Sequence, residues 1–81
     1  MNKTFEYYMS LPYTVMIYSS PEGGFVSEIK ELPGCLSQGE TKEESLKMIE
    51  DAKRAWIDIA LQDGDEIPEP TDTTKKMMKT R

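Results

Sequence analysis

The sequence contains no histidine and only one cysteine, Cys35, among its 81 residues. Histidine is the commonest general base and the commonest metal ligand in proteins, so its absence argues against an enzyme. A single cysteine excludes an internal disulfide and a metal site built from several thiolates. Because no histidine, lysine or arginine lies beside it in sequence, we expect Cys35 to be a small buried hydrophobic residue rather than a nucleophile. We therefore expect no catalytic residue, no metal and no cofactor.

Long hydrophobic runs are also missing. None approaches the roughly 20 apolar residues that a membrane-spanning helix needs, and residues 1–8 lack the apolar core of a signal peptide. A free cysteine without an export signal predicts a cytoplasmic protein that has no membrane partner. The hydrophobic residues, 37% of the chain, are concentrated in residues 13–18, 25–29 and 46–61, which indicates one small folded domain.

Positive charge is scarce over most of the chain. Residues 1–70 contain six Lys or Arg against 14 Asp or Glu, a net charge of −8, whereas residues 71–81 contain four against one, a net charge of +3. An acidic body repels nucleic-acid phosphates and attracts a basic protein, although the same charge also serves solubility. We interpret residues 1–70 as the domain and residues 71–81 as a polar, basic C-terminal tail.

Turn residues divide the chain into short elements. Residues 13–18 and 25–29 are rich in β-branched and aromatic residues and are predicted to form an antiparallel hairpin across Gly23-Gly24. Pro33-Gly34 precedes a short third strand predicted at 35–38. Residues 42–63 are predicted to form the long helix. This pattern indicates an α+β domain in which a small, mainly antiparallel sheet of three to four strands is packed by one long helix.

The predicted long helix has signals at both ends. Thr41 and Glu44 fit a capping box, and Gly64 followed by Pro68 fits a C-terminal stop. Trp56 lies on an apolar stripe, so we expect it to pack against the sheet rather than to form a partner hot spot. The stripe, at three- and four-residue spacing, contains Leu46, Ile49, Ala52, Trp56, Ile59 and Ala60.

A small sheet with one helix also occurs in metal-dependent nucleases, which hold divalent ions with several carboxylates. Such a site normally places an acid in the first strand, and residues 13–18 contain none. Glu28 is the only acid inside a predicted strand. The acids at 50, 51 and 58 are expected on the solvated surface of the helix, so the sequence does not favour a nuclease.

The order and spacing of these elements resemble the HicB family of antitoxins from type II toxin–antitoxin systems. The resemblance implies a partial RNase H-like fold that lacks the nuclease's catalytic acids. It also implies a binding domain that blocks the active site of a HicA-like toxin, a small basic mRNA interferase. The residues that carry it, between about 7 and 70, are Tyr13-Thr14-Val15, Gly23-Gly24-Phe25, Leu32-Pro33-Gly34-Cys35, Ser37–Glu44, the helix through Trp56, and Ile67-Pro68-Glu69-Pro70.

The sequence departs from the family pattern in two ways. Many HicB proteins continue into a helix-turn-helix or ribbon-helix-helix module, and this chain stops before one, so we expect no DNA-binding module and no direct nucleic-acid partner. The family fold also tends to place a strand after the helix, and residues 71–81 are a poor candidate for it. A sheet of only three strands leaves an edge open for self-association, which predicts a homo-oligomer.

Acids near the sheet loops and the start of the helix are the expected contacts to a basic toxin, because carboxylates there replace RNA phosphates. These residues are Glu22, Glu28, Glu31, Glu40 and Glu43. Two other functions stay open. One is a stand-alone homo-oligomeric regulatory or ligand-binding module without a toxin partner, and the other is a divergent RNase H-like nuclease that depends on Glu28.

Overall fold

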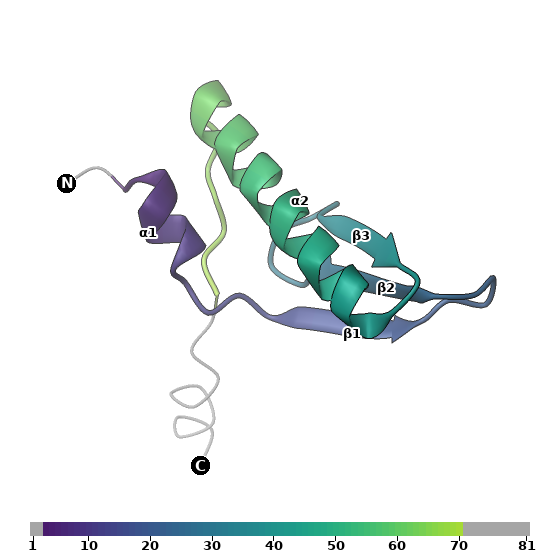
Figure 1. Cartoon of the computed structure of the whole chain (residues 1–81). Coiled ribbons are helices and arrows are strands. Elements are labelled where there is room, and N and C mark those ends of the chain that lie inside the picture. Colours follow the sequence, from purple (N-terminus) through teal and green to yellow (C-terminus); the bar gives the residue numbers. More distant parts are fainter. Residues whose placement is uncertain (1–2, 71–81) are drawn as a thin grey trace, which may run out of the picture.

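One long helix lies across a three-stranded antiparallel sheet in the computed structural model, which describes residues 3–70 (Figure 1). The predicted α+β class and the single long helix are confirmed. The predicted tail and the possible fourth strand at 71–81 lie outside the described residues. In chain order the elements are α1 (Phe5–Met9), β1 (Val15–Ser19), β2 (Phe25–Ile29), β3 (Leu36–Gly39) and α2 (Lys42–Asp63).

The sheet has the order β1-β2-β3, so each strand pairs with its neighbour in sequence. Both pairs are antiparallel, with Ile17 opposite Ser27 and Ser27 opposite Ser37. The predicted hairpin is therefore confirmed, although β1 starts two residues later than expected. The third strand starts one residue later than predicted because Cys35 belongs to the preceding turn, where its N–H donates to the Leu32 carbonyl at 3.0 Å.

Helix α2 begins and ends where the sequence predicts. The Thr41 hydroxyl accepts a hydrogen bond from the Glu44 N–H at 3.0 Å, and Gly64 ends the helix with a left-handed φ of 72°. The second bond of the capping box is shifted by one residue, since the Glu44 carboxylate accepts from the Glu40 N–H at 2.6 Å. The cap thus fixes the chain between β3 and α2 as well as the helix itself.

The buried face of α2 differs from the predicted apolar stripe. Leu46 and Ile59 were expected to be buried, but they are 45% and 57% exposed. A serine and a lysine occupy part of the buried face. Apolar periodicity does not predict the burial of such polar residues. The residues of α2 that are buried are Ser45, Ile49, Lys53, Ile57 and Ala60.

Hydrogen bonds and a nearby carboxylate allow the two polar residues to be buried. The Ser45 hydroxyl donates to the Ser27 hydroxyl at 2.8 Å, and the Ser27 hydroxyl donates to the Ser45 carbonyl at 2.8 Å. Lys53 buries its stem while its ammonium lies 3.5 Å from the Glu50 carboxylate. Helix α2 is therefore joined to the middle of β2 by polar as well as apolar contacts.

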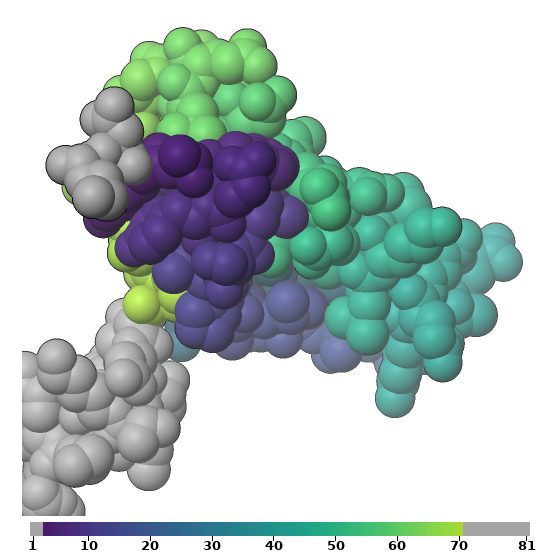
Figure 2. Space-filling model, turned by 60° about the vertical axis from the view of Figure 1, so that its left-hand side comes forward, coloured from purple at the N-terminus to yellow at the C-terminus, as the bar shows by residue number. Residues whose placement is uncertain are grey.

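The short helix α1 was not predicted, because residues 1–12 show no helical period. Thr4 caps it by accepting from the Tyr7 N–H at 3.1 Å. Figures 1 and 2 show α1 beside the C-terminal part of α2 and the chain that follows it, and Tyr8 is its buried residue. A helix of five residues depends on such packing for its stability.

The core lies between the sheet and α2 and continues under α1. Cys35 is 3% exposed, which confirms the prediction of a buried residue. Trp56 is partly buried against the core, as predicted, and its indole N–H donates to the Pro33 carbonyl at 2.8 Å. Neither described helix is long and apolar enough to cross a membrane. The core residues are Tyr8, Tyr13, Ile29, Leu32, Cys35, Ile49, Ile57, Ala60 and Ile67.

Candidate functional site: an acidic groove at the start of the long helix

A groove of about 650 Å³ opens where the loop between β1 and β2 meets the N-terminal end of α2. Its lining contains three carboxylates and no basic side chain. Carboxylates of this kind attract a cationic group and repel phosphate. The lining residues are Glu22, Gly23, Gly24, Gln38, Gly39, Glu40, Glu44 and Met48.

Two glycines let the backbone segments around the groove approach closely. A side chain at Gly24 would place its Cβ 2.6 Å from the Gly39 carbonyl oxygen, and one at Gly39 would place its Cβ 2.6 Å from the Ser45 nitrogen. Such distances are too short for any Cβ, so both positions require glycine. The contact through Gly24 and Gly39 brings Glu22, in the first loop, into the same groove as Glu40.

The start of α2 concentrates negative charge beside the groove. Glu43 and Glu44 occupy the first turn, where the positive end of the helix dipole favours carboxylates. Glu44 is held in place by the Glu40 N–H. The Lys42 ammonium lies 5.8 Å from the centre of the Phe25 ring. Within residues 3–70, no group of three or more His, Cys, Asp or Glu side chains could hold a metal ion.

The structure brings together some of the five predicted contact acids. Glu22 and Glu40 both line the groove, and Glu43 is exposed beside it in the first turn of α2. Glu44 also lines the groove, although it was expected only to cap α2 and to favour its dipole and was not among the predicted contacts. The spacing that identifies the cap could also have placed Glu44 near Glu40, because a capping glutamate reaches back toward the residues before the helix.

The other two acids lie elsewhere and have partners in the fold. Glu31 follows β2, and its carboxylate accepts from the Thr14 N–H at 2.9 Å and the Thr14 hydroxyl at 2.8 Å. Glu28 lies in β2, where it accepts from the Tyr18 hydroxyl at 2.8 Å. This hydrogen bond raises the pKa of Tyr18. The predicted roles of all five acids in toxin binding stay predictions.

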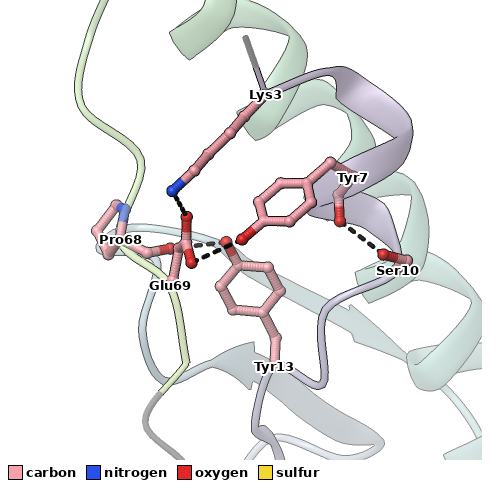
Figure 3. A network of polar contacts seen from close by, with 6 residues as sticks. All are labelled: Lys3, Tyr7, Ser10, Tyr13, Pro68 and Glu69. Carbon is pink, nitrogen blue, oxygen red and sulfur yellow. Dashed lines mark hydrogen bonds and ion pairs between the residues drawn. The ribbon is translucent and has the colours of Figure 1, made fainter. Parts of the chain in front are cut away.

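A separate polar network joins α1 to the chain after α2 (Figure 3). The Glu69 carboxylate accepts from the Lys3 ammonium at 2.6 Å and from the Tyr7 hydroxyl at 3.0 Å. These bonds lower the pKa of Glu69, with the Lys3 bond contributing most. Nearby, the Tyr13 hydroxyl donates to the Pro68 carbonyl at 2.6 Å, and burial raises the pKa of Tyr13 to about 12.

Comparison with known proteins adds a sequence relationship to this geometry. The family model described as a HicB-like antitoxin of bacterial toxin–antitoxin systems matches residues 13–81, so α1 lies outside the match. The chain is 45% identical over 56 residues to a UPF0150 protein of Synechocystis sp., a stretch that covers 69% of this chain and 77% of that protein. It is 40% identical over 58 residues to a UPF0150 protein of Thermoplasma acidophilum, covering 72% of this chain and 84% of the relative.

A third relative carries a functional name. The antitoxin HicB of Escherichia coli strain K12 is 34% identical to this chain over 59 residues, which are 73% of this chain and 43% of the antitoxin. The aligned stretch is long enough to include both the sheet and α2.

Proposed function

Because this chain belongs to the HicB-like antitoxin family of bacterial toxin–antitoxin systems, we propose that it binds and silences a small basic mRNA interferase of the HicA type. A toxin is the partner that an antitoxin family implies. The ribonuclease activity of that toxin, its HicA-like identity and a cytoplasmic place of action are our proposals. In this function the chain acts by binding and carries out no reaction of its own.

The acidic groove is the observation that supports this proposal. An enzyme that binds RNA needs a positive surface, and Glu22, Glu40 and Glu44 offer a compact negative one. The net charge of −8 over residues 1–70 adds a long-range attraction to any basic partner. Such attraction raises the rate of association and makes binding depend on salt.

The carboxylates outside the groove fit a binding role better than a catalytic one. Strand β1 contains no acid, and Glu28 on β2 is hydrogen-bonded to Tyr18 rather than grouped with other carboxylates. A two-metal nuclease gathers several carboxylates around ions about 4 Å apart. The described residues contain no such group.

The direct experiment is to co-purify this chain with the small basic protein encoded beside it and to assay RNA cleavage by that protein with and without this chain. We expect a stable complex and a strong loss of cleavage at equimolar antitoxin. If neither binding nor inhibition is seen, the antitoxin proposal fails. The stand-alone homo-oligomeric regulatory or ligand-binding module would then become the better explanation.

A matched pair of charge reversals tests the groove itself. The variant Glu22→Lys/Glu40→Lys should weaken toxin binding by about tenfold to a hundredfold, because it replaces attraction with repulsion at the contact. The control Asp63→Lys/Glu66→Lys changes the net charge equally at the other end of α2, where both side chains are exposed. Equal losses in both variants would show that only overall charge matters, and no loss in either would remove the groove from the interface.

A further inference from the structure

A second hollow, of about 280 Å³, lies near the C-terminal end of α2. Most of its lining is apolar, and Ile59 in it is 57% exposed. The Trp56 indole N–H donates to the Pro33 carbonyl at 2.8 Å, which holds the ring in place. We call this feature the Trp56 hollow, and its lining residues are Trp56, Ile59, Ala60 and Asp65.

Acidic side chains lie close to this apolar surface. The Asp65 N–H donates to the Ala60 carbonyl at 2.9 Å in the turn that ends α2, which fixes Asp65 at the hollow. Residues 55–70 contain five Asp or Glu and no Lys or Arg, and of these acids Glu69 is paired with Lys3. An apolar hollow among carboxylates fits a segment that carries both apolar and basic side chains.

The chain itself contains such a segment in its C-terminal tail. Residues 71–81 contain four Lys or Arg and one acid, and Met77 and Met78 lie between Lys76 and Lys79. Methionine is unbranched, adapts to irregular apolar surfaces and makes favourable contacts with aromatic rings. The tail therefore matches the Trp56 hollow both in its apolar side chains and in its charge.

The tail is also long enough to reach the hollow. Asp65 and Pro70 are five residues apart, so the described chain ends within about 18 Å of Asp65. Seven more residues carry Met77 up to about 25 Å from Pro70, which allows the chain to return to the hollow. Figure 1 shows that the described chain ends far from the loop between β1 and β2, so the acidic groove is the more distant site.

Tethering favours the tail over a separate molecule. Another copy of the acidic domain would bring carboxylates against carboxylates at the hollow. A segment joined by a short linker has an effective concentration of about 1 mM, so a contact with a dissociation constant of about 1 mM is occupied in about half of the molecules. Even a weak contact is therefore populated when the tail makes it.

We propose that the Trp56 hollow is the docking site of the chain's own C-terminal tail. The two methionines enter the hollow and cover Ile59 and the Trp56 ring, while lysines of the tail pair with the carboxylates around it. The docked tail neutralises part of the acid at this end of α2. The acidic groove at the other end then stays the main negative surface of the domain.

The chain has one tryptophan, so quenching of its fluorescence by acrylamide reports on this contact. In the full chain at low salt, the quenching constant should be about half of that in Met77→Ser/Met78→Ser, because about half of the tails cover the ring. The matched control Thr73→Ser/Thr74→Ser changes two tail side chains that are not anchors and should behave as the wild type. Equal quenching in the wild type and the methionine variant overturns the proposal, as does an equal rise in the threonine control.

Salt and protein concentration separate the tail from other occupants. Salt screens the attraction between lysines and carboxylates, so about 0.5 M NaCl should raise the quenching constant of the wild type toward that of the methionine variant. Quenching that falls as the protein concentration rises would assign the hollow to a second copy. Protection that appears only when the small basic protein encoded beside this chain is added would assign it to the toxin. Either result overturns docking of the tail.

Nuclear Overhauser contacts locate the tail directly. With ¹³C-methyl methionine, the methyl groups of Met77 and Met78 should show contacts to the Trp56 indole. Ile59→Lys should abolish them, whereas Leu46→Lys, at another exposed position of α2, should keep them. Contacts of the tail to β1 instead would make it an added edge strand and would overturn the proposal. These measurements use this chain alone, so docking of the tail and silencing of a toxin can fail separately.

Discussion

The ammonium of Lys3 lies 2.6 Å from a carboxylate oxygen of Glu69, although 66 residues separate them in sequence. The other oxygen of Glu69 accepts from the Tyr7 hydroxyl (Figure 3). One carboxylate therefore fastens α1 to the segment that follows α2. Both contacts are exposed to solvent, so each is a weak interaction whose strength depends on pH and salt.

Acid should loosen this contact. The pKa of Glu69 is below its ordinary 4.5, first because of the Lys3 bond and then because of the Tyr7 bond. The contribution of the ionised Glu69 carboxylate to the docking of α1 is therefore complete above about pH 4.5. It is lost as the pH falls through the lowered pKa of Glu69. The NMR shifts of the Tyr7 ring should show this transition in the wild type. They should not show it in Glu69→Gln, and Glu66→Gln should behave as the wild type. Persistence of the transition in Glu69→Gln would assign it to another group.

Two glycine substitutions should separate steric from conformational cost. Gly39→Ala should destabilise the fold by about 2 to 3 kcal/mol, because its Cβ would collide with the backbone of α2. Gly34 has a φ of 79° and open space around it, so Gly34→Ala should cost only about 1 kcal/mol, from strain alone. Urea unfolding of both variants measures the difference. Equal costs would mean that the chain around Gly39 adjusts more easily than the distances indicate.

The two buried serines should behave as a coupled pair. Ser27→Ala removes the acceptor of the Ser45 hydroxyl and should cost about 1 to 3 kcal/mol, because a buried donor loses its partner. Ser45→Ala leaves the Ser27 hydroxyl its bond to the Ser45 carbonyl and should cost less. In a double-mutant cycle, the double variant should lose less stability than the sum of the single variants. Simple additivity would show that the hydroxyls find other partners.

Alkali should weaken the contact between Tyr13 and the segment at Pro68. Burial raises the pKa of Tyr13 from 10.0 to about 12. The stabilisation from the protonated hydroxyl is therefore complete below pH 10 and is lost as pH rises toward 12. Absorbance titration of the phenolates should show a step near pH 12, and Tyr13→Phe should remove that step. The same variant should cost about 1 kcal/mol at neutral pH, from the lost hydrogen bond. A step near pH 12 that survives in Tyr13→Phe would assign that pKa to a different tyrosine.

The fold could be predicted where its signals are local. Thr41, Glu44 and Gly64 mark the ends of α2 by side-chain and backbone chemistry that acts within a few residues. The paired strands also follow from adjacent stretches of sequence. Burial of Ser45 could not be predicted in this way, because its partner, Ser27, lies 18 residues away on the sheet. Helix α1 was missed for a related reason, since its five residues depend on packing against α2.

In the candidate site, too, the positions set by local sequence could be predicted and those set by distant contacts could not. Glu40 and Glu43 could be placed near each other because they flank the N-terminal cap of α2, and the glycines of the first loop suggested a place for Glu22. The surroundings of Glu28 and Glu31 depend on strand register and on the pairing with Tyr18 and Thr14. The resemblance to the HicB family predicted the α+β fold correctly but gave no positions for contact residues.

The sequential order of the three strands has a consequence for how the chain folds. Each strand meets its partner across a short loop, and such loops close quickly and at small entropic cost. Contact between Lys3 and Glu69 requires both ends of the described chain to meet, and this closure costs less entropy once the sheet and α2 have formed between them. We therefore expect α1 to dock last during folding and to detach first when the protein opens.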